Sequence, residues 1–202
     1  STLPDRLWRE TAPSPYGWLE GVTWSGDGEA VAFSVDYDGY PAEILVAEVG
    51  AAGAPNVWRL TRPGTTSFAW GLQWRGESRD LCFQVMDRAR MRLVCVDRVQ
   101  AGSQGRTTEF TPGNVVVWSA AFTDDGSQYV VNAGSSTTFS DLHVGRSSRP
   151  GKGLRKVTDL NPQARTWKLP QIQLFSWQAA DGTTVEGVLE LPPDWKEGDP
   201  PL

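Results

Sequence analysis

The 202-residue chain lacks several features that would place it at once in a well-marked class of protein. No stretch approaches 18 consecutive apolar residues, so no membrane-spanning helix is expected. A single histidine, His143, and two cysteines, Cys82 and Cys95, are too few for a zinc site or a framework of several disulfides. No basic run occurs, and 24 acidic against 19 basic side chains give a net charge of −5. This balance argues against nucleic acid as a partner.

Aliphatic side chains are also scarce, and aromatic ones make up the difference. Leu, Ile, Val and Phe together account for 44 of the 202 residues, just above the level below which chains stay disordered. Ten Trp, seven Phe and four Tyr compensate, because each buried aromatic removes roughly 150–250 Å² from water. We therefore expect a globular chain with an aromatic-rich core. No Asn-x-Ser/Thr glycosylation signal is present and nothing else indicates secretion, so a cytoplasmic location is expected, with secretion left open as the alternative.

An internal repeat of about 50 residues organises the chain. Each unit has an aromatic residue, a short polar turn with acidic residues, and then an alternating apolar run, at residues 21–35, 71–86 and 119–131. The aromatic residues Trp24, Trp74 and Phe122 stand in register, and a second aromatic precedes each of them: Trp18, Trp70 and Trp118. The regular placement of these tryptophans favours packing between units over stacking on a carbohydrate.

The ends of the repeats carry a second signal. Three units close on a threonine, in Arg59-Leu60-Thr61, Glu109-Phe110-Thr111 and Lys156-Val157-Thr158. Arg9-Glu10-Thr11 fits the same slot before the first unit. Residues 1–11 are therefore predicted to form the last strand of a preceding unit.

Each unit contains four short segments with the period-2 alternation of strands. These segments are 18–25, 29–35, 43–49 and 56–62, then 70–75, 80–86, 91–97 and 106–111, then 118–123, 127–133, 140–146 and 154–158. Four strands in about 40–50 residues are typical of a β-propeller blade. The predicted fold is all-β: a partial β-propeller of three four-stranded blades, at about 17–62, 70–111 and 118–158, plus an orphan strand. An open or sandwich-like β-domain with three degenerate repeats is the alternative.

The pattern changes after Thr158. Asn161-Pro162 and Leu169-Pro170 interrupt the chain. Asp181-Gly182 then forms a turn signal between two alternating runs, 171–178 and 184–191, which predicts a hairpin. The sequence therefore divides into residues 1–160 and a separate segment, 161–202.

Together these motifs resemble one family of enzymes. Tandem Trp/Phe-Ser-x-Asp-Gly units, followed by the stretch from Ser176 to Pro193, are similar to the prolyl oligopeptidase family of serine peptidases, which includes acylaminoacyl and dipeptidyl peptidases. In that family a propeller caps an α/β-hydrolase domain. The resemblance implies that residues 161–202 are the hinge and first hairpin of such a domain. It also implies a gating role in the cleavage of peptide or acyl-peptide substrates.

The resemblance leaves the catalytic residues outside this chain. No Gly-x-Ser-x-Gly elbow is present, and the nearest approach, Gly145-Arg146-Ser147-Ser148-Arg149, lacks the second glycine. His143 lies in a predicted strand where other blades have Val46, Val94 or their neighbours, so a structural role is expected. The expected partner is a complementary polypeptide, or the remainder of the same protein, that carries the hydrolase domain.

Asp-Gly pairs raise the question of a metal. Asp27-Gly28, Asp124-Asp125-Gly126 and Asp181-Gly182 lack the ligand spacing of a calcium loop, and turns between strands explain them better. No metal or other cofactor is expected.

The two cysteines are predicted to face each other. The hairpin Asp87-Arg88-Ala89-Arg90 centres its pairing between residues 88 and 89, which places 86 opposite 91, 84 opposite 93 and Cys82 opposite Cys95. A bridge is geometrically possible. Because free cysteine is a common core residue, two thiols are favoured over a disulfide.

Arg88, Arg90, Arg92 and Arg98 form a local basic patch. A solvated hairpin explains it, and propeller geometry offers a functional hypothesis. The turns between second and third strands lie on the face from which the chain leaves the last blade. Residues in those turns are predicted to face the substrate: Tyr37, Asp38, Tyr40, Arg88 and Arg90, with Ser136 and Thr138 beside them. Asp27, Glu77 and Asp125 are predicted to face away.

Two other functions stay open at this point. A non-catalytic propeller that scaffolds protein–protein contacts is one, although a scaffold has no evident use for a hydrolase hairpin. A related hydrolase of small-molecule esters or amides is the other.

Overall fold

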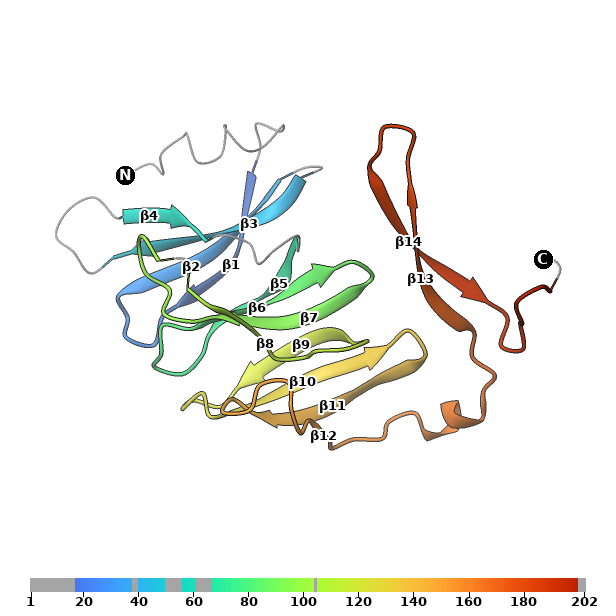
Figure 1. Cartoon of the computed structure of the whole chain (residues 1–202). Helices are drawn as coiled ribbons and strands as arrows, with labels where there is room; N and C mark the ends of the chain where they lie inside the picture. The colour runs from blue at the N-terminus through green and yellow to red at the C-terminus, as the bar shows by residue number, and fades with distance from the viewer. Residues whose placement is uncertain (1–16, 38–39, 50–55, 61–66, 104, 200–202) are drawn as a thin grey trace.

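The computed structural model describes residues 17–37, 40–49, 56–60, 67–103 and 105–199 (Figure 1). More than half of the described residues lie in strands, and these residues contain no α-helix, only the short 3₁₀ turn η1 (Pro162–Thr166). The predicted all-β class is confirmed. None of the described segments is a helix long and apolar enough to cross a membrane.

Three successive units of four antiparallel strands follow the repeat. The first contains β1 (Gly17–Trp24), β2 (Ala30–Tyr37), β3 (Tyr40–Glu48) and β4 (Asn56–Arg59). The second contains β5 (Ser67–Trp74), β6 (Leu81–Asp87), β7 (Arg90–Val96) and β8 (Thr107–Glu109). The third contains β9 (Val116–Phe122), β10 (Gln128–Ser135), β11 (Thr138–Arg146) and β12 (Arg155–Lys156). Every strand predicted within these units is present.

The second and third units are joined more closely than separate blades would be. One parallel pair, Met91 with Val116, links β7 to β9, so the two units form a single eight-stranded sheet. The link is short because β8 occupies the other end of the same edge of β7. Each unit otherwise keeps its own antiparallel pairing.

The middle unit is apolar on both faces. One face packs on the first unit, where Phe83 and Val94 meet Ala32 and Val46 in one cluster. The other face packs on the third unit, where Leu93 meets Val131. Leu81 through Val85 are therefore all buried, and β6 is an unbroken buried run instead of an alternating one.

Three of the tryptophans connect neighbouring units, as predicted. Trp74 is buried, and its Nε1 donates to the Thr23 carbonyl of β1 at 3.2 Å. Trp70 Nε1 donates to the Trp118 carbonyl at 2.9 Å, and the two rings stack. Exposure does not separate the tryptophans: Trp18 is 53% exposed and Trp24 60%, and Trp118 is 52% exposed although its ring stacks on Trp70.

The turns between first and second strands stack against one another at one end of the units. A Cβ on Gly76 would lie 2.9 Å from the Asp125 main chain, and one on Gly26 would lie 2.5 Å from the Gly76 carbonyl. Gly76 also has φ +57°, which favours glycine. Arg79 adds a salt bridge across units, with Nε 2.5 Å from Asp27 Oδ2.

Cys82 and Cys95 form a disulfide, so the expectation of two thiols was wrong. The predicted pairing itself is confirmed: Cys82 lies opposite Cys95, Gln84 opposite Leu93 and Met86 opposite Met91. Both cysteines are buried on the face toward the third unit, where their sulfur atoms meet directly across the strands. Register predicts the opposition of two cysteines but does not decide whether they are oxidised.

The threonines that close the repeats extend the pairing of the outer strands. Thr111 Oγ1 accepts the Leu93 amide at 2.8 Å, and Thr158 Oγ1 accepts the Leu142 amide at 2.9 Å. In each case the side chain takes the place of a main-chain acceptor beyond the last strand. Thr61 and residues 1–11 lie outside the described residues, so the predicted orphan strand stays a prediction.

The last described part of the chain is a connecting segment followed by a hairpin. After β12 the chain passes through η1 and enters β13 (Gln171–Gln178), which pairs antiparallel with β14 (Thr184–Leu191) along its whole length. Both strands have the predicted bounds. The turn signal is confirmed as well, since Asp181 Oδ1 accepts the Thr183 amide and Gly182 has φ +83°.

Candidate substrate-facing rim

The three turns between second and third strands lie at one end of the units, on the side of the β13–β14 hairpin (Figure 1). In antiparallel sheets, alternate turns must lie at opposite ends. The turns that contain Asp27, Glu77 and Asp125 therefore lie at the other end, as predicted. We call the end that carries the β2–β3, β6–β7 and β10–β11 turns the rim.

Arg88 connects the rim to the hairpin. It occupies the two-residue turn between Asp87 and Arg90, with φ +59°. Its Nε lies 3.2 Å from Glu186 Oε1 of β14. Both side chains are partly exposed, so the pair contributes at most about 1 kcal/mol and can open readily.

Arg90 is held more loosely than Arg88. Its Nε approaches Asn114 Oδ1 at 3.4 Å, the long end of hydrogen-bond distance. The side chain keeps most of its donors available.

The rest of the predicted basic patch is not part of the rim. Arg92 is mostly buried and forms salt bridges to Asp87, at 3.2 Å, and to Glu109 of β8. Arg98 lies beyond the far end of β7, where its amide donates to Asp80 Oδ1 at 3.0 Å. Expecting four arginines in one patch was therefore wrong, because a strand's length separates the two ends of β7.

Less of the rim can be described in the first unit. Tyr37 and Tyr40 pair through their main chains where β2 meets β3, which places both on the rim. Their side chains, and the whole of Asp38, lie outside the described residues.

The third unit contributes a cavity to the rim. It has a volume of about 320 Å³, within the range of small-ligand sites, and Asn114, Ser135, Thr138 and His143 are among its lining residues. Ser136 is exposed in the adjoining turn. Asn114 lines the cavity and also contacts Arg90, so the cavity lies beside Arg90.

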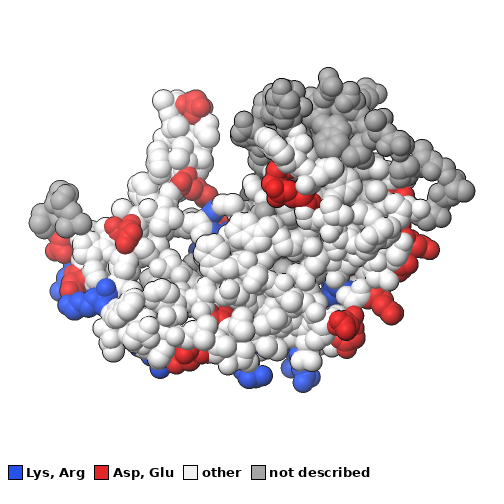
Figure 2. All heavy atoms as spheres, turned by 180° about the vertical axis from the view of Figure 1, so that it is seen from behind, with Lys and Arg blue, Asp and Glu red and all other residues white. Residues whose placement is uncertain are grey.

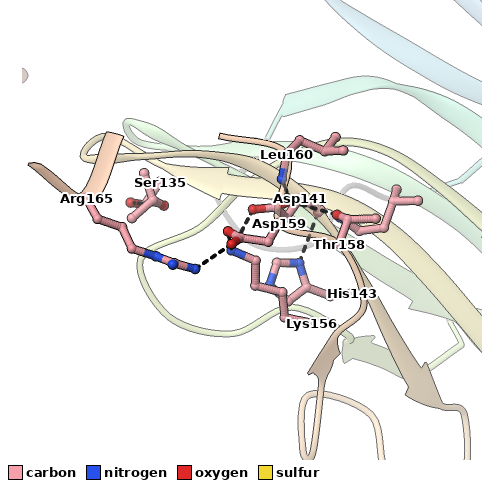
Figure 3. Close-up of polar contacts among 10 residues, drawn as sticks. Ser135, Asp141, His143, Lys156, Thr158, Asp159, Leu160 and Arg165 are labelled. Atoms are coloured by element: carbon pink, nitrogen blue, oxygen red, sulfur yellow. Dashed lines mark hydrogen bonds and ion pairs between the residues drawn. The ribbon is translucent and has the colours of Figure 1, made fainter. Parts of the chain in front are cut away.

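A buried carboxylate supports this cavity and the segment that follows β12 (Figure 3). Asp141 Oδ2 lies 2.7 Å from Lys156 Nζ, while its Oδ1 accepts from Thr158 Oγ1 at 2.7 Å and from the Leu160 amide at 3.0 Å. These contacts, the Lys156 bond foremost, lower the pKa of Asp141 to about 2. The same bond raises the pKa of Lys156. Arg165 of η1 adds a salt bridge to Asp159 at 2.6 Å.

His143 takes no part in a nucleophile–base pair among the described residues. Its Nδ1 lies 3.0 Å from the main-chain oxygen of Asp141, and Ser135 Oγ is bonded to Thr138 Oγ1 at 2.8 Å instead (Figure 3). The Asp141 carboxylate is occupied by Lys156 and Thr158. The three side chains are therefore close in space but do not have the contacts of a catalytic triad.

The Asp-Gly turns are held by local hydrogen bonds. Asp125 accepts from Thr123 Oγ1 at 2.6 Å and from the Ser127 amide, which lowers its pKa to about 2. Asp27 accepts from Ser25 Oγ at 2.5 Å, which lowers its pKa in the same way. These bonds account for the carboxylates as turn-forming groups. Among the residues with described positions, no three metal-ligating side chains are grouped.

Two elements of this site were not anticipated from the sequence. Glu186 gave no signal beyond its place in the hairpin motif. The Asp141–Lys156 pair has counterparts in Glu43–Arg59, at 2.9 Å, and Arg92–Glu109. Arg59, Glu109 and Lys156 each stand two residues before the threonine of their repeat, so a charged residue of either sign at that position was the one available signal.

No protein-family model and no curated protein matches the chain. Solved structures do match. The ligand-free structure of AtxE2 isopeptidase is similar over 98% of this chain, with a TM-score of 0.59 and 15% sequence identity. Its S527A variant with astexin3-dC4 bound has a TM-score of 0.57 and 16% sequence identity to this chain. A protein assigned as TolB from Agrobacterium tumefaciens gives 0.53 and 15% over 90% of this chain.

The matches confirm the predicted likeness at the level of the fold. The similar isopeptidase is a peptidase of the prolyl oligopeptidase family, and the match includes the propeller part of this chain. The chain spans only 29% of the isopeptidase and 61% of the TolB-assigned protein.

Proposed function

We propose that this chain is the propeller and gating part of a serine hydrolase similar to the prolyl oligopeptidase family, acting on peptide or acyl-peptide substrates. The observation that carries the proposal is the Arg88–Glu186 contact, which joins the rim to the hairpin at 3.2 Å. A propeller that caps a hydrolase needs such a junction on one face only. The fold likeness to a peptidase supports the same arrangement.

In this proposal the catalytic serine, aspartate and histidine lie outside these 202 residues. The sequence has no Gly-x-Ser-x-Gly elbow to hold a nucleophile. Residues 1–160 form the propeller part, with blades at about 17–62, 70–111 and 118–158, and residues 161–202 form the hinge and first hydrolase hairpin. The partner is the polypeptide, or remainder of the protein, that carries the triad.

The rim would then face the substrate cavity. Arg90 has donors available for a peptide carboxylate or carbonyl, and Arg88 can supply more when its bond to Glu186 opens. Tyr37, Asp38 and Tyr40 would complete the rim from the first unit. The propeller would act by limiting which molecules reach the catalytic serine.

The disulfide bears on where the protein works. Structural disulfides persist in oxidising compartments and are rare in the reducing cytoplasm. Cys82–Cys95 therefore favours an oxidising compartment, against the cytoplasmic location expected from the sequence.

The proposal is tested by labelling the complete protein that contains these residues with a fluorophosphonate probe, followed by assays with peptide anilides and simple nitrophenyl esters. Labelling outside residues 1–202, together with anilide hydrolysis, is expected. Labelling with ester hydrolysis alone would replace the peptidase with a hydrolase of small molecules. The absence of any labelled serine would leave a scaffold as the better account.

A further inference from the structure

A second candidate site lies at the end of the molecule opposite the rim. The β11–β12 turn borders an open cavity of about 470 Å³. Its position follows from pairing: Arg146 at the end of β11 lies opposite Gln128 at the start of β10, and Ser147 donates its amide to the Ser127 carbonyl. The cavity therefore adjoins the Asp125 turn, a strand's length from Arg88 and Arg90. This site is independent of the proposed function.

Basic side chains dominate this cavity. Four cations are among its lining residues, Arg146, Arg149, Lys152 and Arg155, together with the Ser148 hydroxyl. No carboxylate is among the described residues that line it. Figure 2 shows small separate groups of basic side chains along the lower edge of the molecule, with acidic groups beside some of them.

Among the described residues these four cations form a cluster without acidic partners; Arg90, Arg98 and Lys196 also lack such partners there but lie apart in the sequence. None of the four lies within 4.0 Å of a carboxylate in the part of the chain that the structure describes. The basic residues that do form such pairs are Arg59, Arg75, Arg79, Arg88, Arg92, Arg106, Lys156, Arg165 and Lys168. In a chain with a net charge of −5, four neighbouring cations without such a partner form a local positive field that attracts anions.

Main-chain hydrogen bonds hold the turn that carries the cations. The Arg149 amide donates to the Arg146 carbonyl, and the Lys152 amide donates to the Arg149 carbonyl. Gly151 has φ +71°, and a Cβ there would lie 2.7 Å from Pro112, so the turn rests directly on that ring. A fixed backbone lowers the entropy cost of holding the side chains around a ligand.

We propose that this cavity binds a compact polyanion of the phosphate class, such as a polyphosphate or the phosphate groups of a nucleotide. Three guanidinium groups can bind phosphate oxygens in bidentate fashion, and Lys152 adds a point charge. The cavity has the volume of a small-molecule site. An extended polymer such as DNA fits poorly, because the cations come from one ten-residue segment of an otherwise acidic chain.

The test is titration calorimetry of the complete protein with sodium tripolyphosphate at about 0.15 M salt. The double variant Arg149→Gln/Arg155→Gln removes two of the four charges. Arg106→Gln is the matched control, because Arg106 is 81% exposed, lies in another turn and has one weak partner, Asp97 at 3.8 Å. Circular dichroism of each variant establishes that it is folded.

One-to-one saturable binding is expected, with an affinity reduced at least about tenfold in the double variant and unchanged in the control. Competition by ATP would extend the same site to nucleotides. The proposal is overturned by a lack of saturable binding, by equal loss in the control, or by duplex DNA binding more tightly than tripolyphosphate.

Discussion

The Cys82–Cys95 disulfide closes a loop inside the middle unit, where both sulfur atoms are buried between units. Replacing both cysteines by alanine is expected to lower the free energy of unfolding by about 3 kcal/mol, the value for a loop of about 15 residues. Urea unfolding of the complete protein, with and without reductant, measures this. Alkylation of the unfolded but unreduced protein at either cysteine would contradict the bridge.

Asp141 is a second residue whose chemistry makes a prediction. Its pKa of about 2 lies below the ordinary value of 3.8, because the folded state stabilises the charged form through Lys156 and Thr158. A lowered pKa contributes stability that is complete above about pH 4 and is lost as the pH falls toward 2. Asp141→Asn should therefore lower the melting temperature at pH 7 and reduce the fall in stability between pH 4 and pH 2.

Asp194→Asn is the control for that change. Asp194 is 82% exposed and pairs only with Lys168 among the described residues. Its replacement should change neither the melting temperature at pH 7 nor the fall in stability between pH 4 and pH 2. An equal fall in stability between pH 4 and pH 2 for the wild type and Asp141→Asn would show that the Asp141–Lys156 pair does not stabilise the fold.

The contact between the turns of neighbouring units can be tested by replacing glycines. Gly28 and Gly76 both have positive φ, but a Cβ on Gly28 would meet nothing within 4 Å, whereas one on Gly76 would press on the Asp125 main chain. Gly28→Ala should cost about 1 kcal/mol from backbone strain alone. Gly76→Ala should cost at least about 1 kcal/mol more, because the neighbouring turn must move. Urea unfolding of the pair tests this, and equal costs would contradict close contact between the units.

The sequence was most informative where a repeat and a period of two coincide. Trp24, Trp74 and Phe122 set the register of the units, and the pairing of Cys82 with Cys95 followed from one turn. The ion pairs between third and fourth strands were missed because their polarity reverses. Glu43 pairs with Arg59 and Asp141 with Lys156, but Arg92 pairs with Glu109. Because the position of the ion pair recurs in each unit while the signs of its charges are exchanged, the same residue type does not recur at these positions.

The rim was only partly predictable for a different reason. Arg88 was expected there because turn order fixes which end of a sheet a loop occupies. The contact of Arg88 with Glu186 depends on where the chain places the β13–β14 hairpin, which no local sequence pattern encodes. Contacts between segments far apart in sequence require the folded structure.

At the scale of the whole molecule, the hairpin exposes much apolar surface. Phe175 is 53% exposed and Val188 55%, with Leu174, Trp177 and Leu189 also exposed. Leaving several such side chains in water costs several kcal/mol, a large share of the stability of a domain. Residues 1–202 expressed alone should therefore self-associate or unfold at low temperature, as sedimentation and thermal unfolding would record. A stable monomer that unfolds cooperatively would instead favour a non-catalytic scaffold that folds on its own.

The central claim is that the propeller controls access to a hydrolase. It is tested most directly by presenting the complete protein with one cleavable sequence in two forms, as a short free peptide and within a loop of a stably folded protein. The account predicts cleavage of the free peptide and none of the folded protein, because the latter cannot enter past the rim. Equal rates of cleavage for the two forms would contradict it.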